Sequence, residues 1–169
     1  MATIKRIWSR EILDSRGIPT VECYCQLDDG RFATASVPAG TSTGSHEALE
    51  LRDKDNARYH GEGVLKACEN INTILGPVVV GMDPARQADI DQKLITTDGT
   101  ENKSKYGGNA ILAISEVVCK VAALSQNKAL YSWINDLAVE RGMKKGIRTP
   151  TPLLNMINGG LHGAGNLDF

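Results

Sequence analysis

Between residues 21 and 27 apolar and polar side chains alternate, and this pattern limits the possible fold more than any other feature of the chain. Such alternation is typical of a β-strand with one buried and one exposed face. The sequence Asp28-Asp29-Gly30 follows at once and predicts a hairpin, because Asp-Gly tolerates positive φ at low steric cost. Residues 32–37 then supply the return strand. The chain is therefore expected to contain an antiparallel sheet with one apolar face.

A further strand and a series of helices complete the predicted fold. Residues 4–13 end at the turn signal Asp14-Ser15-Arg16-Gly17 and extend the sheet to a three-stranded meander. Apolar residues three and four apart predict about four helices: one over 64–75, one starting at Asp83-Pro84 with Asp as the N-cap, one over 110–124 and one from 130 to about 141. Strands followed by helices are typical of an α+β fold with the helices on one face of the sheet.

The composition changes after Gly142. We expect a folded domain over residues 1–141, a linker over 142–149, and a new start over 150–169. The apolar run 153–158 is typical of a strand buried on both faces. One strand and one loop cannot bury themselves, so we expect residues 149–169 to pack poorly unless another chain covers them.

Composition and charge exclude several classes of protein. The net charge of −1 gives no field that would favour nucleic acid or an anionic membrane. No apolar run is expected to span a bilayer, and the N-terminus lacks the pattern of a signal peptide. The four cysteines lie far apart without a Cys-x-x-Cys pair, which favours reduced core thiols in a cytoplasmic protein over a disulfide framework.

Two loops carry residues with functional chemistry. In the first, the hydroxyl residues Thr41, Ser42 and Thr43 lie between Gly40 and Gly44. Hard oxygen atoms suit Mg²⁺ and phosphate, although a solvated connection would have the same composition. The loop is not a P-loop, because the Gly-Lys-Ser/Thr ending is missing.

The second loop surrounds His162. Four glycines in residues 159–165, including Gly159 and Gly160, would let the backbone approach a ligand, and the imidazole could donate to a phosphate or take part in proton transfer. A structural role is the alternative. His46 and His60 are interpreted as surface residues, and Glu47 and Glu50 as one exposed helical turn rather than a catalytic pair.

Several short motifs occur along the sequence in a fixed order. They are Leu13-Asp14-Ser15-Arg16-Gly17, Pro19-Thr20-Val21-Glu22, Ser42-Thr43-Gly44, His46-Glu47-Ala48-Leu49-Glu50-Leu51-Arg52-Asp53, residues 98–105, residues 109–112, Asn158-Gly159-Gly160, His162 and Asn166-Leu167-Asp168-Phe169. In this order and spacing they resemble the enolase family (phosphopyruvate hydratase) over the whole chain.

The resemblance implies an N-terminal capping domain followed by the first strand of a β/α barrel. It further implies a cytoplasmic, glycolytic, homodimeric or larger enzyme that converts 2-phosphoglycerate to phosphoenolpyruvate with two Mg²⁺ ions, and no nucleic-acid or membrane partner. Ser42 would ligate the second Mg²⁺ from a mobile lid, and His162 would approach the substrate phosphate from another. Arg10 and Glu22 would lie at the dimer interface, with their ionic partners on the other subunit's barrel.

The resemblance also implies that the catalytic acid and base, the acidic ligands of the first Mg²⁺ and the phosphate-binding Arg and Ser lie beyond Phe169. We therefore expect no catalytic residue within these 169 residues and no activity from them alone. Two alternatives remain: a stand-alone, non-enzymatic capping-domain module, and a related superfamily member acting on a different acid substrate.

Overall fold

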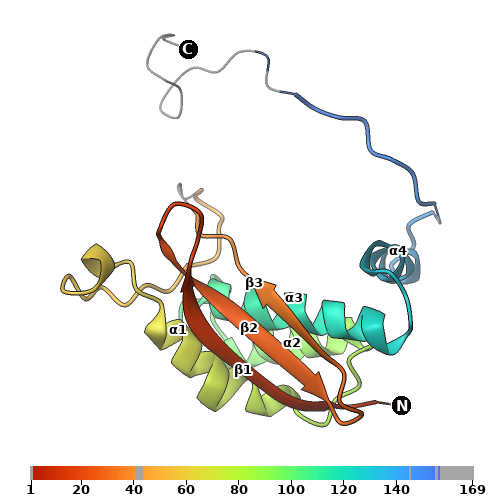
Figure 1. Ribbon diagram of the computed structural model, residues 1–169, viewed down its shortest axis with the longest axis horizontal. Coiled ribbons are helices and arrows are strands. Elements are labelled where there is room, and N and C mark those ends of the chain that lie inside the picture. The colour runs from red at the N-terminus through yellow and green to blue at the C-terminus, as the bar shows by residue number, and fades with distance from the viewer. Residues whose placement is uncertain (1, 41–43, 145, 155, 157–169) are drawn as a thin grey trace.

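A three-stranded antiparallel sheet forms the N-terminal part of the fold. The computed structural model describes residues 2–40, 44–144, 146–154 and 156. Strands β1 (Ile4–Leu13), β2 (Pro19–Leu27) and β3 (Phe32–Ser36) lie in the order β1-β2-β3, as Figure 1 shows. The Asp14 carboxylate accepts the backbone N–H groups of Arg16 and Ile18 and so closes the first turn. Gly30, at φ +90°, allows the second turn. The predicted meander is confirmed.

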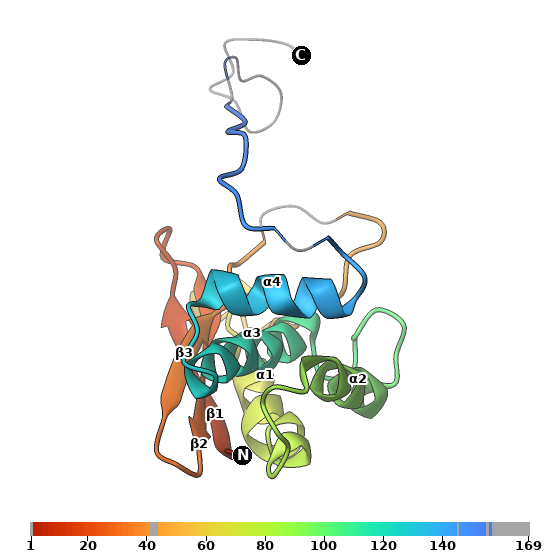
Figure 2. The same cartoon turned by 90° about the vertical axis from the view of Figure 1, so that its right-hand side faces the viewer.

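Helices cover one face of this sheet (Figures 1 and 2). The helical elements are η1 (Tyr59–Gly61), α1 (Leu65–Asn70), η2 (Ile71–Leu75), η3 (Pro77–Val79), α2 (Gln87–Asp98), α3 (Gly108–Ser125) and α4 (Leu130–Glu140). Helix α3 packs on β2 and β3, whereas α1 and η2 pack on β1. The α+β class and the four predicted helical regions are confirmed.

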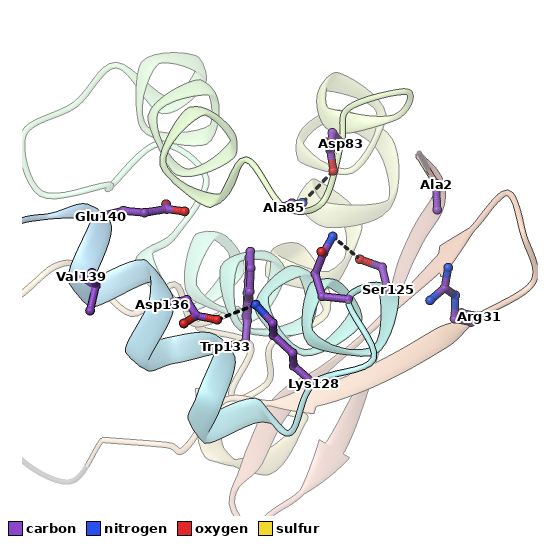
Figure 3. Close-up of a pocket in the computed structure, with 11 residues that line it drawn as sticks. Ala2, Arg31, Asp83, Ala85, Ser125, Lys128, Trp133, Asp136, Val139 and Glu140 are labelled. Atoms are coloured by element: carbon purple, nitrogen blue, oxygen red, sulfur yellow. Dashed lines mark hydrogen bonds and ion pairs between the residues drawn. The ribbon is translucent and has the colours of Figure 1, made fainter. Parts of the chain in front are cut away.

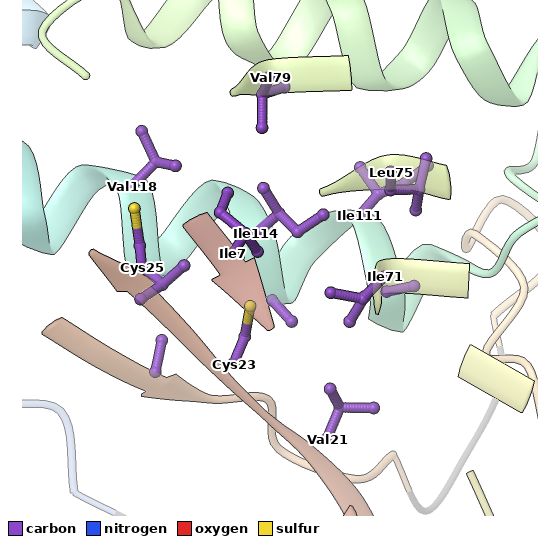
Figure 4. Packing of buried hydrophobic residues seen from close by; sticks show 14 of the residues in the cluster. Ile7, Val21, Cys23, Cys25, Ile71, Leu75, Val79, Ile111, Ile114 and Val118 are labelled. Atoms are coloured by element: carbon purple, nitrogen blue, oxygen red, sulfur yellow. The ribbon is translucent and has the colours of Figure 1, made fainter. Parts of the chain in front are cut away.

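The core lies between β2 and α3. Strand β2 directs Val21, Cys23 and Cys25 toward Ile114 and Val118 of α3, and all five side chains have 0% exposure (Figure 4). The cysteines are free thiols, as predicted. Burial raises the pKa of Cys25 to about 12, so this thiol stays protonated and packs as a small apolar side chain.

Helix α3 is the most apolar element. By length and composition alone it would also be long enough to cross a membrane, contrary to the expectation from the sequence. More than half of it is buried within the fold. Packing against the sheet therefore accounts for its composition.

Two local predictions are wrong. Helix α2 begins at Gln87, not at Asp83, because the Asp83 carboxylate accepts the N–H of Ala85 at 2.9 Å and forms a turn before the helix. Residues Glu47 and Glu50 do not form a helical turn. Their segment has no regular structure and is hydrogen-bonded to a distant part of the chain, as described below.

The described residues after α4, up to 154 and including 156, form no helix or strand. Residues 146–154 run away from the domain in Figure 1, and Leu153 and Leu154 are 96% and 76% exposed. This agrees with the poor packing expected for that stretch. The predicted barrel strand is not shown, since most of residues 155–169 lie outside the described part of the chain.

Limited trypsin digestion tests the predicted domain boundary. Arg141, Lys144 and Arg148 are exposed and follow the last helix, so we expect the first cuts there, leaving a resistant product that ends within residues 141–148. Mass spectrometry of the products identifies the cut sites. Earlier cleavage at Lys120, within α3, would contradict the boundary.

Candidate functional site

The loop that leaves β3 is held firmly where it begins. The Arg16 guanidinium donates to the carbonyl of Ala39 at 2.8 Å, and the Asp14 carboxylate accepts from the same guanidinium at 2.9 Å and 3.0 Å. Two residues before Ala39, the carbonyl of Val37 accepts a hydrogen bond from the Thr20 hydroxyl. These bonds connect the start of the loop to the β1–β2 turn, which is itself part of the sheet.

The same loop is held again where it ends. The N–H of Leu49 donates to the carbonyl of Asn102 at 2.8 Å, and the N–H of Gly108 donates to the carbonyl of Leu49 at 2.7 Å. The Asn109 side-chain amide accepts from the N–H of Leu51 and donates to its carbonyl, both at 3.1 Å. The start of α3 and the loop before it therefore fix the backbone at residues 49–51.

A cleft of about 460 Å³ lies between these two ends. Gly40, Gly44 and Glu47 line one part of it, and Arg52 and Glu62 line another. Arg52 forms an ion pair with Glu62 at 3.5 Å and also donates to the Glu62 carbonyl at 2.7 Å. A cleft with hydroxyl- and glycine-bearing chain at its edge and charged groups inside is suited to a polar ligand.

The sequence-predicted site residues are only partly within the described structure. Gly40 and Gly44 are described and exposed. Thr41, Ser42, Thr43, Gly159, Gly160 and His162 lie outside the described residues. Among the described residues, no group of three or more His, Cys, Asp or Glu side chains could hold a metal ion. The Mg²⁺ and phosphate roles therefore stay predictions.

Arg10 and Glu22 lie together on the face of the sheet opposite the helices. They occupy facing positions on β1 and β2, and Arg10 Nε donates to Glu22 Oε2 at 2.7 Å. The Tyr24 hydroxyl also donates to this carboxylate. The hydrogen bond from Tyr24 lowers the pKa of Glu22, and the ion pair with Arg10 lowers it further. The predicted interface residues are thus paired within one chain.

An aromatic pair extends this face, which the sequence analysis did not identify. Trp8 and Tyr24 stack with ring centroids 5.1 Å apart and planes within 5°. Arg6 lies over the Trp8 ring at 4.9 Å, and Arg10 over the Tyr24 ring at 5.6 Å. The i, i+2 spacing of Arg6, Trp8 and Arg10 is the signal that could have indicated a shared surface.

A buried carboxylate, also missed, organises the loop between α2 and α3. Asp98 is 2% exposed and accepts the N–H of Thr100 at 3.0 Å and the N–H of Tyr106 at 2.8 Å, together with the Thr100 hydroxyl. Burial alone would raise the pKa of Asp98, but these hydrogen bonds outweigh it and lower the pKa. This loop supplies Asn102, which holds Leu49.

A larger cleft, about 890 Å³, lies elsewhere, between α4, the β2–β3 hairpin and the turn at Asp83 (Figure 3). Within it Lys128 pairs with Asp136 at 2.7 Å, and Asp83 accepts from Ala85. None of the sequence-predicted site residues that the structure describes lines it. Size alone therefore does not make it the candidate site.

Comparison with known families gives one match. A family model described as the N-terminal domain of enolase matches residues 4–134, which is well over half of the chain. The match spans the sheet, α1 to α3, the loop after β3 and the beginning of α4.

The Asp98 network makes a prediction about pH. Asp98→Asn keeps the size of the side chain but removes the charged acceptor, and we expect it to lower the free energy of unfolding by about 1–3 kcal/mol at neutral pH. Because the folded pKa is lowered, this stabilisation is present above the unfolded value of about 3.9 and is lost as pH falls through the folded pKa. Urea unfolding at a series of pH values should show the two proteins converging below about pH 4. Glu101→Gln, at an exposed position, is the control; a constant gap at all pH values would contradict the assignment.

Proposed function

We propose that this chain, which belongs to the enolase family through its N-terminal domain, caps the active site of a cytoplasmic enolase. At that site 2-phosphoglycerate would be dehydrated to phosphoenolpyruvate. The observation that carries this proposal is the loop after β3, which is hydrogen-bonded to the domain at Ala39 and at Leu51. The hydroxyl residues lie between these two fixed ends. Movement of such a loop would leave the sheet undisturbed, as a substrate lid requires.

The residues of this loop suit the expected metal. The hydroxyl of Ser42 is a hard oxygen donor of the kind that Mg²⁺ prefers, and it would hold one of the two ions. Bound Mg²⁺ would stabilise negative charge on the substrate carboxylate. Gly40 and Gly44 would give the loop its freedom, and His162 would donate to the substrate phosphate, beside Gly159 and Gly160.

The chain's own role is therefore orientation and exclusion of water rather than proton transfer. The resemblance assigns the base and the acid to residues that these 169 do not include, and we expect the chain by itself to be inactive. A non-enzymatic capping module is the second candidate. It is favoured by the core, which is complete within β1 to α3 and needs nothing from residues 141–156.

Complementation tests the capping role. The purified chain should not turn over 2-phosphoglycerate in the presence of Mg²⁺, whereas addition of a separately expressed enolase barrel should give activity, followed by the absorbance of the enol product. Ser42→Ala should lower that activity by at least about tenfold through loss of a metal ligand, and Ser45→Ala, a hydroxyl in the same loop, should not. Turnover by the chain alone would refute the expected inactivity. Absence of activity after the chain and the barrel are mixed would favour the non-enzymatic module.

We also propose that the open face of the sheet contributes to a homodimer. Arg10 is exposed and its ion pair with Glu22 lies at the surface, where a second subunit could reach both. Assembly would then exchange the pair within one chain for pairs between chains.

Sedimentation of the complemented enzyme tests this exchange. Glu22→Ala should weaken dimerisation by about tenfold or more, since it removes a charge that would be paired across the interface. Glu101→Ala, far from this face, should leave the dissociation constant unchanged. An unchanged dimer in Glu22→Ala would remove this face from the interface.

A further inference from the structure

The segment after the proposed lid belongs to no strand, yet alternate residues of its backbone are hydrogen-bonded to distant parts of the chain. Residues 48–53 belong to no strand of the sheet. Instead, Leu49 exchanges hydrogen bonds with Asn102 and Gly108, and Leu51 exchanges two with the side chain of Asn109. The Asn109 amide thus acts toward Leu51 as a neighbouring strand would, accepting one bond and donating the other.

Two glycines bring this segment into direct contact with the start of α3. A Cβ on Gly108 would lie 2.9 Å from the Cβ of Ala48 and 3.1 Å from the carbonyl oxygen of Leu49. A Cβ on Gly107, which has φ +99°, would lie 2.7 Å from the Cβ of Leu51. Only glycine allows this approach, so the segment rests on backbone rather than on side chains that could shift.

Among the side chains that hold residues 48–53, Asn109 is the one that bonds the backbone of Leu51 on both sides. It is 5% exposed, and its oxygen also accepts the N–H of Ala110 at 3.1 Å. Aspartate could accept from Leu51 but could not donate to its carbonyl, and alanine could do neither. Because Asn109 is buried, loss of its partner would leave a polar group away from water, which costs free energy.

We propose that Asn109 is a positioning residue that fixes the downstream end of the loop carrying Ser42. This inference rests on the proposed function for its consequence, but not for the anchor itself. Only two residues separate Gly44 from Glu47, and Ala48 joins Glu47 to the anchored Leu49. With Arg16 holding Ala39 upstream, Asn109 completes the attachment of this loop to the domain at its downstream end.

Hydrogen exchange of the chain tests the anchor without any need for activity. In Asn109→Ala the amide of Leu51 should exchange at least about tenfold faster, because it loses its acceptor. Asn109→Asp keeps the acceptor and should retain most of that protection. Asn70→Ala is the matched control. It removes a hydrogen bond of the same length, 3.1 Å, which the Asn70 side-chain amide donates to the Tyr106 carbonyl, and this bond does not involve residues 48–53. Unchanged exchange at Leu51 in Asn109→Ala would overturn the proposal.

Activity of the complemented enzyme then tests the positioning role. Asn109→Ala should raise the Mg²⁺ concentration for half-maximal rate severalfold, whereas Asn70→Ala should not, even if it lowers the melting temperature equally. If Asn109→Ala is poorly folded, Gly108→Ala, which displaces Ala48 while leaving Asn109 in place, should give the same shift. Faster exchange with an unchanged Mg²⁺ dependence would overturn the positioning role. Failure of the wild-type chain to complement any barrel would instead overturn the proposed function. The hydrogen-exchange result would still decide whether Asn109 anchors Leu51.

Discussion

The structure depends on burying one face of a three-stranded sheet, with α3 over β2 and β3 and with α1 and η2 over β1. Isolated sheets of this size are barely stable, because their apolar face stays in water. Helix α3 removes that face from solvent by packing Ile114 and Val118 on Cys23 and Cys25. Once α3 is fixed in this way, its first turn has a fixed place as well. That turn then holds the segment after the proposed lid, so the core and the candidate site share one support.

Most of the fold could be predicted because its signals are local. The alternation of Val21 and Cys23 with polar neighbours defines a strand, and the Asp-Gly turn defines its return. The start of α2 could not be placed, because an aspartate that caps a helix and one that closes a turn before it have the same sequence signature. At Asp83 the carboxylate bonds two residues ahead, to Ala85, and the helix begins later.

The candidate site was less predictable because its contacts are not local. Glu47 and Glu50 have helical spacing, but Leu49 between them and Leu51 after them are paired with residues more than fifty positions away, and this pairing replaces a helix. No periodicity within residues 44–53 contains that information. The pairing of Arg10 with Glu22 is an intermediate case. A register counted from the turn at 14–17 would place Arg10 opposite Val21, one residue away from Glu22, because the strands are joined by five residues and Leu13 faces Pro19. The resemblance assigned the ionic partners of Arg10 and Glu22 to another subunit.

A loop that must both move and present a ligand needs fixed ends more than it needs a fixed middle. If either end could shift, the hydroxyl would reach a different position in each closure. Part of the binding free energy would then be lost in fixing the correct position. Here the upstream end is held by a charged guanidinium at Ala39, and the downstream end by a buried amide at Leu51. Gly107 and Gly108 bring α3 close enough for the second of these bonds to form. Glycine by itself weakens a helix, and its presence at the start of α3 is therefore explained by the close contact with residues 48–51.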